Sequence, residues 1–192
     1  MSKQFIKEQD LLEDAFRLGV KIYNSGFRPT FIVGLWRGGS TVGIYVQECL
    51  QHLGIKTRHI AVRTSYEGAD SYHDMVSKRG QIKVHGLQYL YETLNQDDSL
   101  LIVDDVHNSG VNVEALIAKL SSKMKRNMPQ DTRVATIWSK PDNNVTARQP
   151  DFQLYQTSDW LVLPYELTGL TRDELVANKP FIEPILDSVR RP

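Results

Sequence analysis

The sequence predicts an α/β fold in which a mostly parallel sheet is flanked by helices. Two short apolar runs, at residues 31–33 and 100–103, have the length of buried strands. Each run is followed by a glycine-containing turn and then by a segment whose apolar residues recur at helical spacing. Strands that alternate with helices in this way lie parallel, because each helix carries the chain back to the edge where the next strand begins.

Periodicity and turn residues place the elements in order. Helices are expected at 10–24, 41–53, 86–95 and 112–126, and strands at 31–33, 55–63, 100–103 and 134–138. Apolar residues at helical spacing support the first and last of these helices, namely Leu12, Ala15, Phe16, Gly19 and Tyr23, and then Val113, Leu116, Ile117 and Leu120. Beyond Thr171 we expect one or two helices broken at Pro180 and Pro184, because proline ends most helices.

Length and composition favour a single domain over residues 1–192. With 41% apolar and 24% charged residues, the chain can bury a core, which excludes disordered and fibrous classes. Its 23 basic and 23 acidic side chains give no net charge, so neither nucleic acid nor a membrane is an expected partner. The single Cys49 cannot form an internal disulfide, and the N-terminus lacks an apolar signal segment. A cytoplasmic protein is therefore expected.

Several common site motifs are absent from the sequence. No two glycines lie two residues apart, so the dinucleotide-binding G-x-G-x-x-G motif cannot be present. Gly34 and Gly39 have the glycine spacing of a P-loop, but Ser40 stands where the phosphate-binding lysine is needed. No G-x-S-x-G turn occurs, and five histidines with one cysteine show no zinc-binding spacing. Dehydrogenases, P-loop enzymes and serine hydrolases are disfavoured.

Residues 100–112 combine a buried strand, two carboxylates, a loop of small residues and a helix start. Asp104 and Asp105 follow the strand, at the edge where α/β proteins bind ligands. The amide groups of residues 107–111, together with the helix dipole, would hold a phosphate. Carboxylates beside a phosphate make sense if they accept hydrogen bonds from sugar hydroxyls. A phosphorylated ribose fits both halves of this site; the alternative is an acidic turn that caps a helix.

This stretch resembles the phosphoribosyl pyrophosphate signature of type I phosphoribosyltransferases, in which an apolar strand leads into two acidic residues and a Thr-Gly-x-Thr-like loop. Ser109 and Asn112 stand at the threonine positions, and both side chains still hydrogen-bond phosphate. The resemblance implies the fold of that family. It also implies a phosphoribosyl pyrophosphate site that includes Asp104, Asp105, His107, Asn108, Ser109, Gly110, Val111 and Asn112.

Two further segments resemble parts of the same family. Residues 34–39 (GLWRGG) resemble its pyrophosphate loop, so Arg37, Gly38 and Gly39 would meet the leaving group; the alternative is a strand–helix turn that needs glycines. The polar segment at about 64–80 resembles the flexible hood whose Ser65–Tyr66 pair closes over the substrate. A lid is chemically useful here because an exposed ribosyl centre would react with water.

The region at about 140–170 resembles the base-binding part of xanthine–guanine phosphoribosyltransferases. By that resemblance Lys140 would donate to a purine 6-oxo group, Trp160 would stack on the ring and the backbone of Leu161 would contact the exocyclic edge. Glu166 would lie near the magnesium–pyrophosphate side. The resemblance therefore implies Mg²⁺ as cofactor, held partly indirectly by Asp104, Asp105 and Glu166. The alternatives are a core tryptophan and a solvated lysine.

Asn108 departs from the family pattern. Purine enzymes carry an aspartate there, which lies beside purine N7 and acts as general base and acid. Asparagine can hydrogen-bond this ring nitrogen but cannot accept a proton at neutral pH. Either the base arrives deprotonated, or another group such as the adjacent His107 transfers the proton, or the preferred base is not a usual 6-oxopurine.

The sequence thus predicts a purine phosphoribosyltransferase that joins hypoxanthine, guanine or xanthine to phosphoribosyl pyrophosphate, giving a nucleoside 5′-monophosphate and pyrophosphate. Asp105, Asn108 and Arg37 are the expected catalytic residues. The alternatives are a regulatory protein that binds nucleotide and a transferase for another base. By resemblance, the expected assembly is a homodimer or homotetramer.

Overall fold

The computed structural model describes residues 3–66 and 82–188, and the chain divides into two compact units. The larger unit runs from Leu12 to Ser158, and the smaller one joins the N-terminal residues up to Leu11 to the chain from Asp159 onward. Each unit is described by itself, and the single domain over 1–192 stays a prediction. Most of the predicted hood, at 67–80, lies outside the described residues.

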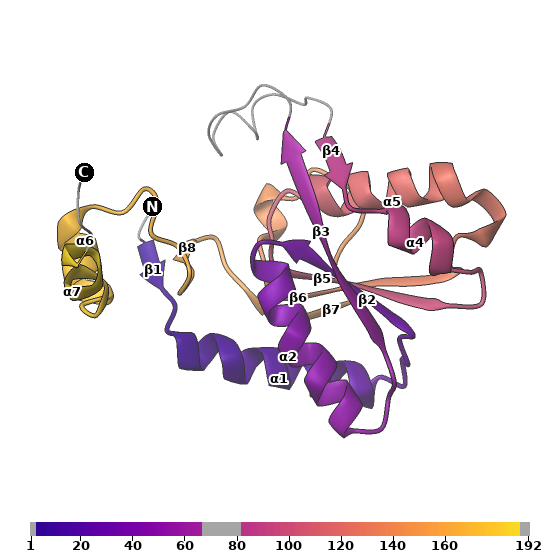
Figure 1. Cartoon of the computed structure of the whole chain (residues 1–192), viewed down its shortest axis with the longest axis horizontal. Coiled ribbons are helices and arrows are strands. Elements are labelled where there is room, and N and C mark those ends of the chain that lie inside the picture. The colour runs from indigo at the N-terminus through magenta and orange to yellow at the C-terminus, as the bar shows by residue number, and fades with distance from the viewer. Residues whose placement is uncertain (1–2, 67–81, 189–192) are drawn as a thin grey trace. The chain divides into compact units, whose positions relative to one another are not determined.

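A six-stranded sheet forms the centre of the larger unit, with the strand order β4-β3-β2-β5-β6-β7 (Figure 1). Only β4 is antiparallel to its neighbour, so the predicted mostly parallel sheet is confirmed. The strands are β2 (Phe31–Trp36), β3 (Arg58–Tyr66), β4 (Ile82–His85), β5 (Ser99–His107), β6 (Asp131–Ser139) and β7 (Phe152–Gln156).

Helices cover both faces of this sheet, as predicted (Figure 1). On one face, α4 and α5 pack on an apolar core that includes Val33, Ile102 and Leu116. On the other face lie α2 and the part of α1 that belongs to this unit, and they approach closely where Gly19 meets Cys49. The elements are α1 (Glu8–Asn24), α2 (Gly38–His52), α4 (Gln88–Thr93), α5 (Val111–Met124) and the short 3₁₀ turns η1 (Lys125–Asn127) and η2 (Pro141–Asn143).

Three predicted boundaries are wrong at the end of the sheet that carries the candidate site. The strand predicted at 31–33 continues to Trp36, and the one predicted at 100–103 continues to His107, because neighbouring strands pair with both. The strand predicted at 55–63 instead spans Arg58–Tyr66. Ser65 and Tyr66, predicted in the loop, therefore end a strand that is paired with β4.

The chain reverses its winding direction between β2 and β5, which lie side by side. From β2 it passes through α2 to β3 on one side, and from β5 it passes through α5 to β6 on the other. Ligands of open α/β sheets bind at the carboxyl ends of strands at such a switch point. The fold therefore places the candidate site where β2 and β5 end.

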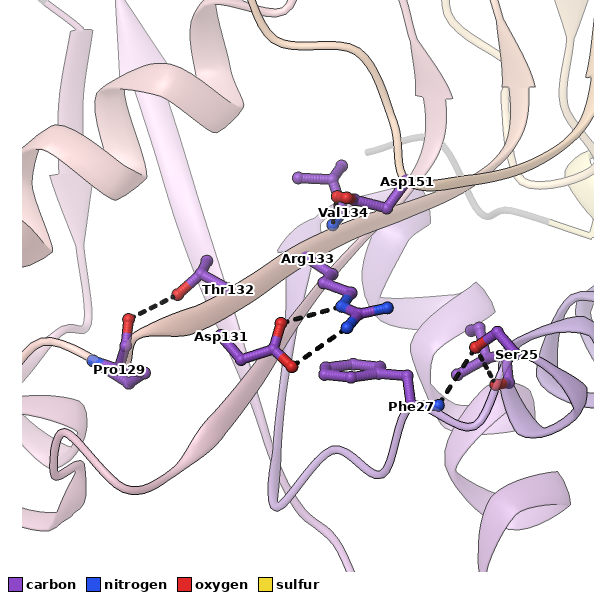
Figure 2. A network of polar contacts seen from close by, with 9 residues as sticks. Ser25, Phe27, Pro129, Asp131, Thr132, Arg133, Val134 and Asp151 are labelled. Carbon is purple, nitrogen blue, oxygen red and sulfur yellow. Dashed lines mark hydrogen bonds and ion pairs between the residues drawn. The ribbon is translucent and has the colours of Figure 1, made fainter.

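The amino end of β6 is fixed by a separate network (Figure 2). The Arg133 guanidinium forms a two-point ion pair with Asp131, with distances of 2.8 and 3.2 Å, and lies over the ring of Phe27. Phe27 in turn stacks on Phe152. The Asp151 carboxylate accepts the Val134 N–H. These contacts anchor the start of the strand at the end of the sheet opposite the candidate site.

The smaller unit contains a two-stranded parallel sheet and two short helices. Its elements are β1 (Lys3–Phe5), β8 (Trp160–Val162), α6 (Arg172–Asn178) and α7 (Ile182–Asp187). Pro180 separates the helices as predicted, but the predicted break at Pro184 is wrong, because Pro184 lies in the first turn of α7, where no amide donor is needed. Within the described ranges no helix has the length and apolar character to span a membrane.

Candidate functional site

Asp104 and Asp105 lie near the end of β5, where the candidate site begins. Both side chains are partly buried, and the Asp105 N–H donates to the Asp104 carboxylate at 3.1 Å. Burial, followed by the charge of Asp105, raises the pKa of Asp104 well above its usual range. Two carboxylates held this close favour a shared proton, sugar hydroxyl donors or a cation between them.

The predicted pyrophosphate loop lies directly against this acidic pair. Gly38 and Gly39 are buried in the first turn of α2, which begins three residues earlier than predicted. A Cβ atom on Gly39 would lie 2.4 Å from the Val103 carbonyl oxygen and 2.8 Å from the Asp104 Cα atom. Only glycine permits this approach, so the structure brings these two predicted parts of the site together. Arg37 is exposed at the start of α2.

The predicted phosphate loop connects β5 to α5. Gly110 adopts a left-handed conformation, with φ of 78°, immediately before α5 begins at Val111. Because glycine has no side chain, it cannot cap the helix itself. Ser109 and Asn112 are partly buried on either side of this turn. A helix N-terminus can bind an anion through its amide groups, and phosphate binding by this loop stays a prediction.

A segment at the start of the predicted base-binding region supports this loop from the side, a role that the sequence did not indicate. We call residues 140–148 the strap. Its residues donate hydrogen bonds to three consecutive loop residues: Lys140 N–H to the His107 carbonyl at 2.9 Å, Asn143 Nδ2 to Asn108 Oδ1 at 2.8 Å, and Val145 N–H to the Ser109 carbonyl at 3.1 Å. The run Pro-Asp-Asn-Asn at 141–144 indicates a turn, but it does not predict that this turn contacts the loop between β5 and α5.

His107 lies behind the loop. Its side chain is 2% exposed, and neither ring nitrogen forms a hydrogen bond of normal geometry with the described residues, although the Arg148 backbone is close enough to favour the protonated ring. Burial is the main cause that lowers the pKa of His107, which favours the neutral ring. Its Nε2 atom lies on the Gly110 side, where an added Cβ would be 3.2 Å away. The imidazole is thus placed for packing. The backbone carbonyl of His107 accepts the Lys140 N–H.

The predicted base-binding residues fall in both units. Lys140 follows β6 at the same end of the sheet as the acidic pair. Trp160, Leu161 and Glu166 belong to the smaller unit. There the Trp160 side chain is 46% exposed, as a stacking platform requires, whereas the Leu161 side chain is buried in β8.

The turn that carries Glu166 is held by a buried lysine that the sequence did not reveal. Lys179 is 5% exposed, and its ammonium group donates to the carbonyls of Leu163, Pro164 and Glu166 at 2.7–2.8 Å. The Glu166 carboxylate accepts the Leu163 N–H at 3.0 Å, which closes the turn. Burial lowers the pKa of Lys179, and the hydrogen bonds compensate for its desolvation.

Replacement of Lys179 by methionine is expected to destabilise this turn by about 2–4 kcal/mol, because one buried and two part-buried carbonyls lose their shared charged donor. Hydrogen exchange of residues 159–188 measures the effect in the smaller unit itself. Lys3→Met is the control, since the Lys3 ammonium group makes an exposed ion pair with Glu174, and this substitution should cost less than about 1 kcal/mol. Equal protection in the two variants would contradict this role for Lys179.

Ser65 and Tyr66 belong to the part of the predicted hood that the structure describes. The Ser65 hydroxyl lies 2.8 Å from His85 Nε2, across the β3–β4 pair. Tyr66 is the last residue of β3. The function of this Ser-Tyr pair stays a prediction.

The residues at the end of β5 fit a divalent cation. Mg²⁺ prefers oxygen ligands and is commonly held by one or two carboxylates together with substrate phosphates. Asp104 and Asp105 supply such a pair, and a cation would offset the repulsion that raises the pKa of Asp104. Among the described residues no group of three metal-ligating side chains is assembled. The predicted third residue, Glu166, uses its carboxylate in its own turn.

Neither a protein-family model nor a curated protein matches the sequence. Solved structures do match. The purine phosphoribosyltransferase from Pyrococcus horikoshii Ot3 is 21% identical with a TM-score of 0.65, over 90% of this chain and 99% of that one. The chain has the type I phosphoribosyltransferase fold.

Two further structures share this type I phosphoribosyltransferase fold. A hypothetical protein from Neisseria gonorrhoeae with bound ppGpp is 19% identical, with a TM-score of 0.70 over 94% of this chain and 97% of that one. The xanthine-guanine-hypoxanthine phosphoribosyltransferase of Helicobacter pylori is 14% identical, with a TM-score of 0.63 over 98% and 100%. The predicted fold and the predicted resemblance are confirmed at the level of the fold.

Proposed function

We propose that the protein is a purine phosphoribosyltransferase. It would transfer the 5-phosphoribosyl group from phosphoribosyl pyrophosphate to hypoxanthine, guanine or xanthine. The observation that carries the proposal is the contact of Gly39 with the backbone at Val103 and Asp104, which brings the predicted pyrophosphate loop against the acidic pair at the switch point of the sheet. A sugar that bears phosphate at one end and pyrophosphate at the other matches this arrangement.

Each part of the site has a task in this reaction. The loop from Asn108 to Asn112 would bind the 5-phosphate, and Asp104 and Asp105 would accept hydrogen bonds from the ribose hydroxyls. The bond from ribose carbon 1 to pyrophosphate breaks, and a bond from that carbon to a base nitrogen forms. The base either arrives without its imidazole proton, which has gone to solvent, or transfers it to another group. Arg37 would balance the charge that develops on the leaving pyrophosphate. Bound Mg²⁺ would supply further positive charge there.

The family resemblance supports the base-binding roles in this proposal. Lys140 would donate to the 6-oxo group, Trp160 would stack on the ring and Leu161 would contact the exocyclic edge through its backbone. Since His107 is buried behind the loop, we assign it no proton transfer. Catalysis would come mainly from positioning and charge stabilisation. A cytoplasmic homodimer or homotetramer remains our expectation for the assembly.

A pyrophosphate-release assay tests the proposal. Protein, Mg²⁺ and phosphoribosyl pyrophosphate are offered hypoxanthine, guanine, xanthine, adenine, uracil or orotate in separate reactions. Release that depends on a 6-oxopurine would support the function, and release with another base would change the substrate class. Binding of phosphoribosyl pyrophosphate without release for any base would contradict a transferase.

Asn108→Asp is expected to raise kcat for neutral 6-oxopurines by about 10²–10⁴-fold, because a carboxylate can accept the proton that asparagine cannot. The kcat–pH profile of the variant should acquire a new ionisation that the parent lacks. Asp142→Asn, an exposed change in the neighbouring strap, is the control. An unchanged rate in Asn108→Asp would show that proton transfer at this position does not limit the reaction.

A second candidate function is nucleotide binding without transfer. Two observations favour it: Asn108 has no proton-accepting group, and the similar Neisseria gonorrhoeae protein holds ppGpp. A ligand that binds the folded state raises its melting temperature. Thermal shifts with ppGpp and GMP, together with no pyrophosphate release, would favour this candidate.

A further inference from the structure

His59 of β3 packs against the second turn of α2. A Cβ atom on Gly34 of β2 would lie 3.0 Å from the His59 Nε2 atom, and one on Gly43 of α2 would lie 2.9 Å from both Nε2 and Cε1. Gly39 and Gly43 are four residues apart, so they lie on the same side of the helix. The ring thus supports the turn that follows Gly39, whose contact with the Asp104 backbone brings the predicted pyrophosphate loop to the acidic pair.

Neighbouring groups fix which ring nitrogen of His59 carries the proton. The Gln47 Nε2 group donates to the Thr57 carbonyl at 3.1 Å, so the oxygen of this amide is the end that faces His59. That oxygen lies 3.3 Å from His59 Nδ1 and can only accept, so the neutral ring carries its proton on Nδ1. Nε2 then has a bare lone pair. This atom is buried and has no hydrogen-bond partner in the part of the chain that the structure describes.

The surroundings of the His59 ring are uncharged. The residues packed around it are Ile32 and Gly34 of β2, Gly43 and Gln47 of α2, and Thr57 just before β3. The described titratable side chains of these elements are exposed or contact α1, namely Tyr45, Glu48, Cys49 and His52 of α2 and Arg58 and Arg63 of β3. Burial is accordingly the one cause that shifts the pKa of His59, and it lowers this pKa.

We propose that His59 is a positioning residue for the pyrophosphate loop: its neutral ring holds the first turns of α2 against the sheet, and protonation of the ring loosens them. A second proton would have to sit on Nε2, where it would lie beside Gly34 and Gly43 without an acceptor. The ring must then turn away, or α2 must move outward and carry Gly39 with it. Binding of a ligand that bears pyrophosphate should therefore weaken in mild acid, a consequence that rests on the proposed function.

The pH dependence has a definite sign. Because burial lowers the pKa of His59, an opened α2 binds a proton at a pH at which the closed arrangement still keeps the ring neutral. The closed arrangement therefore loses stability as the pH falls from the ordinary histidine range toward the lowered pKa, and it is fully stable above that range. One titrating group changes such an equilibrium by at most about tenfold per pH unit.

Hydrogen exchange of residues 38–43 tests the inference without any ligand. Between about pH 7 and pH 5.5, after correction for intrinsic exchange rates, the parent should lose about tenfold in protection, whereas His59→Asn should lose little. Asparagine keeps a donor near the place of Nδ1 but does not titrate in this range. His52→Asn, which removes an exposed histidine of the same helix, is the control and should behave like the parent. A profile shared by the parent and His59→Asn would overturn the inference.

Gly43→Ala tests the contact at a single pH. Its methyl carbon would lie 2.9 Å from two ring atoms of His59, so the same turns should lose protection already at neutral pH. Combination with His59→Asn removes both of these ring atoms and should restore most of the protection. A double variant no better protected than Gly43→Ala would also overturn the inference.

Calorimetric titration with phosphoribosyl pyrophosphate over the same pH range measures the consequence for the site. The affinity of the parent should fall by up to about tenfold more than that of His59→Asn. Ionisation of the ligand affects both proteins equally, so it does not contribute to this difference. Equal losses of affinity would overturn the inference. Failure of both proteins to bind phosphoribosyl pyrophosphate at any pH would overturn the proposed function, while the exchange measurements would still decide the role of His59.

Discussion

Asp104→Asn is expected to stabilise the protein at neutral pH while it weakens binding of phosphoribosyl pyrophosphate. The substitution removes a partly buried negative charge beside Asp105 but keeps the shape of the side chain. Stabilising changes of this kind are commonly worth about 1 kcal/mol, or about 2–4 °C in a protein of this size. The loss of a charged acceptor for ribose hydroxyls should cost about 10- to 100-fold in affinity.

The stabilisation should depend on pH with a definite sign. Burial and the charge of Asp105 raise the pKa of Asp104, so between its ordinary and its raised pKa the folded protein keeps a proton that the unfolded chain has lost. The free energy of unfolding therefore falls as the pH rises through this window. Asparagine does not titrate, so its advantage is full above the raised pKa and disappears below the ordinary one.

Thermal unfolding at several pH values and calorimetric titration with phosphoribosyl pyrophosphate measure both effects. Asp142→Asn, which removes an exposed carboxylate, is the control and should change neither quantity appreciably. A lower melting temperature for Asp104→Asn at neutral pH would show that the carboxylate is compensated within the fold. Unchanged affinity would remove Asp104 from the ligand site.

Gly39→Ala is expected to disturb both the fold and the candidate site. The new methyl carbon would lie 2.4 Å from the Val103 carbonyl oxygen and 2.8 Å from the Asp104 Cα atom, and both are backbone atoms that cannot rotate away. The first turn of α2 must then move from the end of β5. We expect a loss of about 2–3 kcal/mol in the free energy of unfolding. The displacement of Arg37 relative to the acidic pair should lower kcat/KM by about 10²-fold.

Denaturant unfolding and pyrophosphate release check this prediction, with Gly54→Ala as the matched control. Gly54 has a left-handed backbone conformation, with φ of 89°, and an added Cβ atom would meet nothing within 4 Å. Its substitution should cost about 1 kcal/mol through backbone strain and leave activity unchanged. If Gly39→Ala behaved like Gly54→Ala, the contact between α2 and β5 would not organise the site.

The central strands were predictable because each contains a short continuous apolar run bounded by turn residues, which is typical of a fully buried strand. The run at residues 100–103 indicates β5 without further information. Its continuation to His107 was not predictable, since Asp104 and Asp105 have no strand pattern and are held in the sheet by β6. Pro184 was misjudged for a related reason, because its effect depends on its position within the helix.

The predicted site residues came from local motifs, whereas their supports come from distant parts of the chain. The acidic pair and the phosphate loop are adjacent in sequence, so one pattern contains both. The contact between Asn143 and Asn108 spans 35 residues and joins two ordinary turn residues. Nothing in the sequence distinguishes Lys179 from a surface lysine. Its role appears only in the fold, where three backbone carbonyls surround its ammonium group.

That arrangement around Lys179 has a consequence for the ionic conditions under which the smaller unit folds. Three backbone carbonyl oxygens directed at one positive centre are the kind of ligand shell that proteins offer to a potassium ion. Here the positive centre is covalently attached to the chain, through the lysine that follows α6. Its local concentration therefore does not vary with the medium, and we expect the turn that carries Glu166 to keep its shape in potassium and in sodium salts alike.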